Sequence, residues 1–156
     1  MQRPTPNLWF DGNAEEAMNF YLSIFPNSKM LGMTRYTDAG PGPAGSVLSA
    51  TFEINGQEFV AINGGPHYKF TPAVSFSVLC ETQEEVDTLW EKLLAGGAPS
   101  RCGWLTDKFG VSWQVIPRIL PEYLQGRDRV RVNRVMKAML KMVKLDTAAL
   151  ENAYEQ

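Results

Sequence analysis

The polar side chains best suited to holding a ligand lie in two stretches of otherwise apolar sequence. Gln114 stands in the run V-S-W-Q-V-I, two residues after Ser112. Ser75 and Ser77 alternate with apolar residues in the run A-V-S-F-S-V. Because a polar group in an apolar strand needs a hydrogen-bonding partner or a ligand, we predict that these four side chains line a binding cleft. The competing interpretation is that they only satisfy one another and the nearby backbone.

Further candidates lie near the N-terminus and in a connector at the middle of the chain. Asn7 and Trp9 belong to the short run N-L-W-F, and Asn63 precedes the sequence G-G-P-H-Y-K. We expect these three residues to join the cleft, where they would supply two amides and one aromatic contact. His67 is the only histidine, and since imidazole titrates near neutrality, it is the candidate general acid or base. An exposed loop histidine without a role is the alternative.

The element that positions Gln114 is predicted from the sixteen residues C-G-W-L-T-D-K-F-G-V-S-W-Q-V-I-P. Two short runs, 104–106 and 111–116, flank a polar turn and read as a β-hairpin. Side chains alternate along a strand, so Gln114 and Trp113 must lie on opposite faces of the sheet. We expect Trp104 and Trp113 to lie in the core or at an interface.

The rest of the chain predicts two copies of a β-α-β-β-β unit. Residues 15–21 match 84–90 at an offset of 69, and the turn glycine Gly56 matches Gly110 at an offset of 54. A single α+β domain with a chance internal similarity is the alternative. The predicted strands are 7–10, 29–36, 47–54, 58–63, 73–80, 104–106 and 111–116, and the predicted helices of the two units are 14–25 and 82–94.

Turn and cap residues mark the limits of these elements. Asp11 or Asn13 is expected to cap the first helix, and Thr82 with Glu85 forms a capping-box pattern at the second. The sequence D-A-G-P-G-P-A-G at 38–45 cannot form regular structure and predicts an exposed loop.

Composition excludes several classes of protein. The chain has 156 residues, 44% of them hydrophobic, and a formal net charge of −2. These values do not favour a nucleic-acid-binding, membrane or disordered protein. We expect no signal peptide at the N-terminus and no membrane-spanning segment. The two cysteines, Cys80 and Cys102, are expected to be free thiols, which predicts a cytoplasmic location.

A basic segment closes the chain. Seven of the fifteen Lys and Arg residues fall within 127–144, whereas 1–126 carries eight basic and thirteen acidic residues. Residues 128–144 place apolar side chains on one helical face. This pattern fits a helix docked on the acidic body of the same or a partner subunit, and we expect neither a membrane nor a nucleic acid as its partner.

Four motifs carry a resemblance to a known family. They are N-G-G-P-H-Y-K-F-T-P-A-V-S-F-S-V, E-T-Q-E-E-V-D, the hairpin sequence above, and R-V-M-K-A-M-L-K-M-V-K-L-D near the end. Together they resemble the PhnB-like branch of the vicinal oxygen chelate (VOC) superfamily, which includes glyoxalases, bleomycin-resistance proteins and dioxygenases. Its members are often labelled 3-demethylubiquinone-9 3-methyltransferases.

The resemblance implies an α+β fold in which two βαβββ modules form a curled mixed sheet around a cavity, with helices added at the C-terminus. It places a VOC-type domain at residues 1–126, with modules at about 1–64 and 73–117, and a helical extension at 127–156. It also implies a homodimer. It does not decide the activity, because this superfamily supports several chemistries on one fold.

The resemblance also implies where metal-dependent relatives hold their ion. The matching positions are Pro6 or Asn7, Asn63, Ala73 and Gln114, none of which is a histidine or a carboxylate. Neutral amides and an alanine offer a divalent cation little charge, so we expect no metal and no other cofactor. No glycine-rich turn of the kind that a nucleotide-type cofactor needs is found, so we do not expect methyltransferase activity.

The sequence thus predicts a metal-independent protein that binds an unidentified small molecule. Two alternatives stay open. One is a metal-dependent isomerase, lyase or dioxygenase-like enzyme of the same superfamily that uses His67. The other is a resistance-type protein that sequesters a planar drug.

Overall fold

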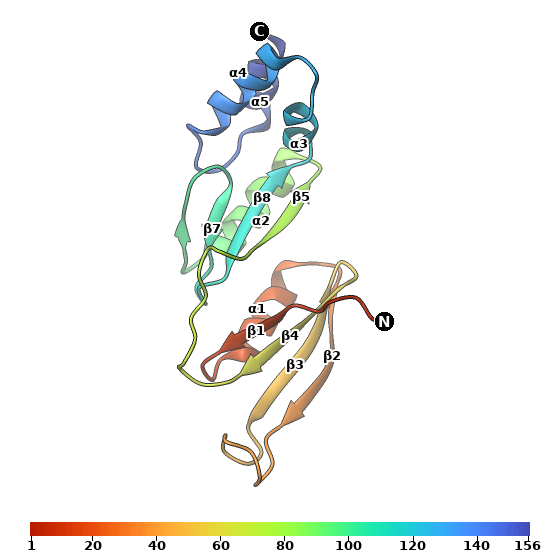
Figure 1. The fold of residues 1–156 in the computed structure, drawn as a ribbon, viewed down its shortest axis with the longest axis vertical. Coiled ribbons are helices and arrows are strands. Elements are labelled where there is room, and N and C mark those ends of the chain that lie inside the picture. The colour runs from red at the N-terminus through yellow and green to blue at the C-terminus, as the bar shows by residue number, and fades with distance from the viewer. The chain divides into compact units, whose positions relative to one another are not determined.

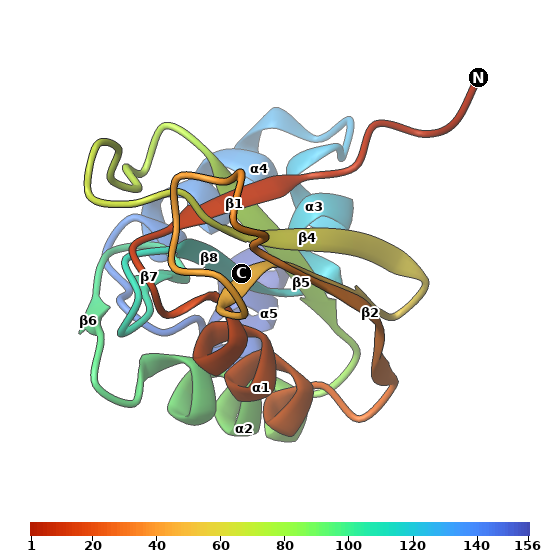
Figure 2. The same cartoon turned by 90° about the horizontal axis from the view of Figure 1, so that it is seen from below.

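The computed structural model describes every residue from Met1 to Gln156, and the chain divides into two compact units, Met1–Lys69 and Phe70–Gln156. Each unit contains a four-stranded mixed sheet with a helix against one face (Figures 1 and 2). Neither sheet is closed into a barrel. The predicted α+β class and the two βαβββ modules are confirmed.

The first unit has the predicted order of elements. Its strands follow the spatial order β1-β4-β3-β2, with β1 parallel to β4 and the other neighbours antiparallel. The Asn55-Gly56 turn joins β3 to β4 with φ values of 48° and 82°, as a tight hairpin of this type requires. The elements are β1 (Asn7–Phe10), α1 (Ala14–Ile24), β2 (Ser28–Arg35), β3 (Val47–Ile54) and β4 (Gln57–Asn63).

Alternate residues of this sheet form the core beneath α1. Phe52 and Phe59 are buried on neighbouring strands, and their rings stack with centroids 5.5 Å apart. Tyr21 of α1 stacks on Phe52 at 6.2 Å. Each such buried ring contributes about 1.5–3 kcal/mol of hydrophobic free energy. The alternation leaves Asn7 and Trp9 of β1 on the opposite face of the sheet.

The start of α1 is not capped as predicted. Asn13 occupies the N-cap position with φ −113° and ψ 25°, and its side chain makes no capping hydrogen bond. Instead, the Asn63 side-chain Oδ1 atom accepts a hydrogen bond of 2.9 Å from the Ala14 amide, and its Nδ2 atom donates to the Val47 carbonyl at 3.1 Å. A residue 49 positions away therefore caps the helix, which local sequence could not reveal.

The second unit repeats the topology of the first. Its strands follow the order β5-β8-β7-β6, again with one parallel pair, β5 and β8. Thr82 caps α2 as predicted, because its side-chain oxygen accepts from the Glu85 amide at 3.2 Å. The elements are β5 (Ser75–Cys80), α2 (Gln83–Leu94), β6 (Ala98–Pro99), β7 (Trp104–Thr106) and β8 (Ser112–Pro117). The two-residue strand β6 was not predicted, since it is too short to show alternation.

Three further helices complete the second unit: α3 (Ile119–Leu124), α4 (Arg129–Met139) and α5 (Thr147–Glu155). They bury Leu120, Val135, Leu145 and Leu150 in a common apolar cluster. None of the helices in the chain is long and apolar enough to cross a bilayer.

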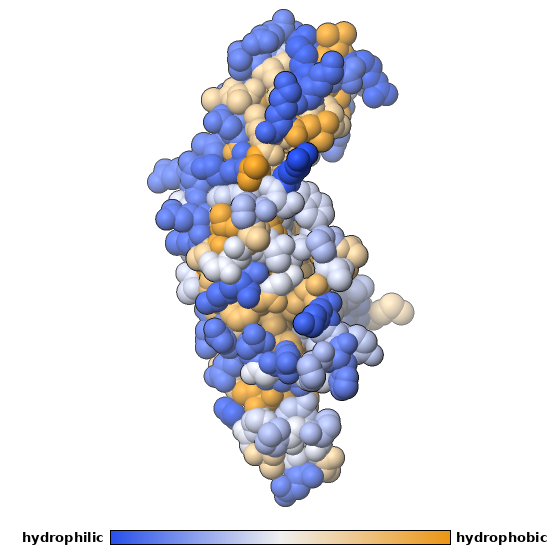
Figure 3. Space-filling model, turned by 90° about the vertical axis from the view of Figure 1, so that its left-hand side faces the viewer, coloured by the Kyte–Doolittle hydropathy of each residue, from blue (hydrophilic) through white to orange (hydrophobic).

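The basic segment docks on its own unit, one of the predicted alternatives. The amides of Cys102 and Gly103 donate to the carbonyls of Met142 and Val143 at 2.9 and 2.8 Å, and Lys144 pairs with Asp87 of α2. Helix α4 ends at Met139, before these contacts, although the apolar pattern continues to residue 143. Hydrophobic patches lie between hydrophilic side chains on the surface of these helices (Figure 3).

Candidate functional site

Four of the predicted site residues lie together on one face of the second sheet. The register pairs Ser75 with Ser112 and Ser77 with Gln114 across the parallel strands β5 and β8. Directly paired residues project to the same face of a sheet, so these side chains are neighbours. The Gln114 side-chain amide donates a hydrogen bond of 2.9 Å to the Ser75 hydroxyl. We call these four residues the polar face.

Apolar residues on the same strands force this orientation. Trp113 and Val115 are buried and belong to the opposite face, which α2 covers. Phe76 meets the Trp113 ring there at a centroid distance of 5.5 Å. Because successive residues alternate in direction, burying Trp113 and Val115 turns Ser112 and Gln114 away from α2, and the register carries Ser75 and Ser77 with them.

The Ser112 hydroxyl is the most unusual group of the polar face. Ser112 is only 3% exposed, and its Oγ atom has no hydrogen-bond partner. An unpartnered buried hydroxyl costs about 1–3 kcal/mol relative to a satisfied one. Ser75 is its direct cross-strand neighbour but is engaged by Gln114. The site therefore offers one unused hydrogen-bonding group beside one amide.

Two residues that were not proposed for the site belong to the same face. Strand β7 pairs Trp104 with Gln114 and Thr106 with Ser112, so both side chains project to the polar face. Trp104 is half-buried, whereas the sequence predicts it in the core or at an interface. A strand of three residues is too short to show alternation in its sequence. Only the pairing of β7 with β8 shows that the Trp104 side chain lies on the same face as Gln114.

The turn between β7 and β8 is built around Asp107. Its carboxylate is buried and accepts hydrogen bonds from the Phe109 amide at 2.8 Å, the Val111 amide at 3.1 Å and the Trp113 indole at 2.9 Å. Asp107, the first residue of the motif D-K-F-G-V-S-W-Q, therefore holds the turn of the hairpin in place. This fixes the strand that carries Ser112 and Gln114.

The other predicted residues lie in the first unit. Trp9 donates its indole N–H to the Gly65 carbonyl at 2.9 Å and packs edge-on against Tyr68 at 5.0 Å. A Cβ atom at Gly64 would overlap the Trp9 ring, so this position accepts only glycine while the ring stays in place. The sequence G-G-P-H-Y thus serves to hold Trp9.

Asn7, Asn63 and His67 also lie in the first unit, in different environments. Asn7 is exposed and donates to the Thr5 carbonyl at 2.9 Å. Both polar atoms of the Asn63 side chain are occupied by the cap of α1 and by β3. His67 is exposed in the connector, and its ring makes no hydrogen bond or ion pair.

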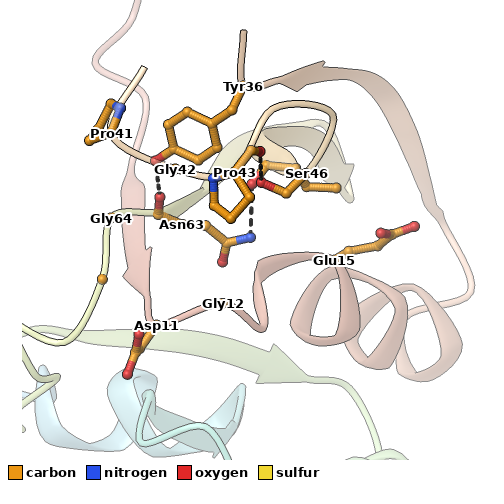
Figure 4. Close-up of a pocket in the computed structure, with 12 residues that line it drawn as sticks. Asp11, Gly12, Glu15, Tyr36, Pro41, Gly42, Pro43, Ser46, Asn63 and Gly64 are labelled. Carbon is orange, nitrogen blue, oxygen red and sulfur yellow. Dashed lines mark hydrogen bonds between the residues drawn. The ribbon is translucent and has the colours of Figure 1, made fainter. Parts of the chain in front are cut away.

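A cavity of about 430 Å³ lies in the first unit and was not predicted (Figure 4). Its walls come from the end of β1, the start of α1, the loop after β2 and the end of β4. Tyr36 donates its hydroxyl hydrogen to the Asn63 carbonyl. The loop bends around the Tyr36 ring, and Cβ atoms at Gly40 and Gly42 would come within 2.7 and 2.5 Å of it. The lining includes Asp11, Glu15, Tyr36, Pro43, Ser46 and Asn63.

The size of this cavity suits a small molecule, but its charged groups do not converge. Asp11 and Glu15 point away from each other (Figure 4). Asn63 and Tyr36 already use their polar atoms on the fold. The polar groups of the cavity therefore do not meet at one point, whereas those of the polar face are neighbours on two paired strands.

The internal repeat identifies which residues stand in equivalent places. The Gly64 amide donates to the Phe10 carbonyl at 3.0 Å, and the Arg118 amide donates to the Cys80 carbonyl at 2.9 Å. These matched bonds make Phe10 equivalent to Cys80. When each strand is followed back by the same number of residues from this match, Asn7 corresponds to Ser77. Their partners on the neighbouring strands, Val60 and Gln114, then correspond to each other.

The residues at these four positions do not fit a divalent cation. Two neutral amides, a valine and a serine supply no charge to offset the dehydration of the ion. The whole chain contains no group of three or more His, Cys, Asp or Glu side chains placed to hold a metal. The repeat also shows that Val60, not Asn63, is the counterpart of Gln114.

Comparison with known proteins agrees with this topology. Residues 2–116 match the family model described as 3-demethylubiquinone-9 3-methyltransferase. The chain belongs to this PhnB-like family. A PhnB protein from Bacillus cereus is 46% identical, with a TM-score of 0.68 over 74% of this chain and 99% of that one. No curated protein is similar enough to be matched.

More distant structures share the fold of this PhnB-like protein. Protein PA1353 from Pseudomonas aeruginosa is 23% identical, with a TM-score of 0.63 over 75% of this chain and 98% of that one. A fosfomycin resistance protein from Listeria monocytogenes, solved with Mn(II) and sulfate, is 16% identical, with a TM-score of 0.56 over 80% and 95%. The fold is therefore that of the VOC superfamily.

The family description names a methyltransferase, but the site gives no support for that activity. The turns from β1 to α1 and from β5 to α2 span residues 11–13 and 81–82, and they contain one glycine between them. A nucleotide-type cofactor needs a glycine-rich turn at such a junction.

Proposed function

We propose that this PhnB-like protein binds a small, uncharged molecule at the polar face without a metal ion. The observation that carries this proposal is the buried, unpartnered hydroxyl of Ser112 beside the amide of Gln114. A ligand that accepts or donates one hydrogen bond there would remove the cost of that orphan group. The four residues of the polar face carry no charge, and neither do Trp104 and Thr106 beside them, which favours an uncharged ligand over an ion.

Trp104 favours a ligand with a flat or apolar portion. The indole lies in the same cross-strand row as Gln114 and Ser77, so a molecule bound by the amide could lie against it. A cytoplasmic location is part of the proposal, supported by two free thiols and the burial of Cys80.

A fragment screen by NMR tests this proposal. Fragments that shift the Gln114 side-chain amide resonances are titrated into the wild-type protein and into the Ser112→Ala and Gln114→Ala variants. Loss of one hydrogen bond to a ligand weakens binding by about fivefold to tenfold, so each variant should raise the dissociation constant by that factor.

Thr147→Val is the matched control, because Thr147 carries the other buried hydroxyl without a partner, in the C-terminal helices. This variant should leave binding unchanged. Equal fragment affinities for the wild type, Ser112→Ala and Gln114→Ala would remove the polar face from the proposed function.

A further inference from the structure

Two apolar side chains adjoin the polar face at the end where strands β5 and β8 finish. The register pairs Leu79 with Ile116, two residues beyond the pair Ser77 and Gln114 on each strand. Side chains two residues apart along a strand project to the same face. Leu79 and Ile116 therefore lie on the face of the serines and not on the face that α2 covers. We call these two residues the apolar row.

Leu79 is exposed although the neighbouring apolar side chains are covered. It is 46% exposed, and it is the only large hydrophobic residue of strands β5 to β8 with such exposure. Ile116 is half-buried, because it packs against the apolar cluster of the C-terminal helices. An apolar group that covered Leu79 would extend this cluster onto the sheet, which is favourable because it removes apolar surface from water.

The chemistry of the face changes in three steps along the strands. The first row carries only hydroxyl groups, from Ser75, Ser112 and Thr106. The second row carries the Gln114 amide and the Trp104 indole, and the third is the apolar row. Adjacent rows lie about 6.6 Å apart, because a strand rises ~3.3 Å per residue. The face thus passes from hydrogen-bonding groups to hydrocarbon within one small molecule's length.

An ion pair follows the apolar row. Two residues beyond Leu79 and Ile116 on each strand, the Arg118 guanidinium donates to the Glu81 carboxylate. Because these two charges offset each other, this end of the face does not attract an ionic group. The ion pair also limits the hydrocarbon to a single row.

We propose that the ligand of the polar face is amphiphilic, with an uncharged hydroxyl or carbonyl head at Ser112 and Gln114 and a short hydrocarbon group over the apolar row. This inference rests on the proposed function and names its ligand class. The first and third rows are about 13 Å apart. An extended hydrocarbon chain advances about 1.3 Å per carbon, so a chain of about eight carbons with its head at Ser112 reaches van der Waals contact with Leu79.

Titrations with 1-butanol and 1-octanol, followed by NMR at the Gln114 side-chain amide and the Leu79 methyl groups, test this ligand class. The two alcohols share one head, but only 1-octanol reaches the apolar row. A methylene that is half covered strengthens binding by about twofold, so 1-octanol should bind about tenfold to twentyfold more tightly than 1-butanol. Octanoate has the same length and should bind more weakly than 1-octanol, because its charge would be unpaired beside Ser112.

Leu79→Ala separates the apolar row from the polar face. This variant should weaken the binding of 1-octanol by about threefold to fivefold, while 1-butanol, which does not reach Leu79, should bind as before. Ser112→Ala should weaken both alcohols by the same factor, since they share the head. Leu31→Ala is the matched control, because Leu31 is 45% exposed on β2 of the first unit. It should bind both alcohols like the wild type.

The outcomes distinguish this inference from the proposed function. If neither the alcohols nor any fragment shifts the Gln114 resonances, both proposals fail. Fragments that bind there while 1-octanol does not would overturn the amphiphilic ligand alone. Equal affinities for the two alcohols, or an equal loss for both in Leu79→Ala, would do the same. Tighter binding of octanoate than of 1-octanol would overturn it in favour of a charged ligand.

Discussion

Replacing Asp107 should destabilise the hairpin that carries the polar face. The carboxylate is 3% exposed and accepts three hydrogen bonds, two from backbone amides of the turn and one from the Trp113 indole. Hydrogen bonds to a charged group contribute about 1.5–3 kcal/mol each, and Asp107→Ala leaves three donors without an acceptor. Because water can enter the opened turn and satisfy part of them, we expect a loss of about 3–5 kcal/mol in the free energy of unfolding.

Urea unfolding followed by tryptophan fluorescence measures this loss, since three of the four tryptophans lie in the second unit. Asp107→Asn keeps one acceptor oxygen but places an amide against the Trp113 indole, so it should cost about 1.5–3 kcal/mol. A double-mutant cycle with Trp113→Phe tests the indole contact. In the Trp113→Phe background, Asp107→Asn should lower the free energy of unfolding by less than it does in the wild type, because the indole donor is then absent.

Asp38→Ala is the control for Asp107, because Asp38 is exposed in the loop after β2. It should change the free energy of unfolding by no more than about 0.5 kcal/mol. A loss below about 1 kcal/mol for Asp107→Ala would show that the three hydrogen bonds do not stabilise the turn.

Three other predictions follow from single contacts. Gly64→Ala should lower the melting temperature, because the added methyl group displaces the Trp9 ring; an unchanged near-ultraviolet circular dichroism spectrum would argue against it. Burial, together with nearby Glu85 and Glu81, raises the pKa of Cys80 to about 11, so this thiol should resist a disulfide reagent at pH 8 until the protein unfolds. Hydrogen bonds from Lys144 and Gln83 lower the pKa of Asp87 below its ordinary value of 3.8. The ionised Asp87 carboxylate therefore stabilises the fold at pH values above 3.8, and this stabilisation is lost as the pH falls through the lowered pKa. Asp87→Asn should flatten the acid side of the melting-temperature profile, and an unchanged profile would contradict this.

Much of the fold could be predicted from the sequence because the two repeats follow local rules. The hairpin at Asn55-Gly56 and the cap at Thr82 depend on residues close in the chain, and both are confirmed. The cap of α1 could not be predicted, since it comes from Asn63, which arrives from another strand. The loop at 38–45 was predicted as a loop, but its wrapping around Tyr36 depends on contacts that composition does not encode.

The site was predicted in part for the same reason. Alternation placed Ser75, Ser77, Ser112 and Gln114 on one face, and the register confirms that they are neighbours. The membership of Trp104 depends on how β7 pairs with β8, which a run of three residues does not specify. Whether Asn7, Trp9, Asn63 or His67 takes part in binding stays a prediction.

We propose above that the polar face binds an uncharged small molecule without a metal ion. The most direct test is an NMR fragment titration of protein dialysed against a chelator, observed at the Gln114 side-chain amide and the Ser112 backbone amide. Saturable shifts are expected at both positions in the metal-free protein, unchanged after manganese or zinc is added. Shifts that arise only with added metal, or only at residues outside the polar face, would contradict it.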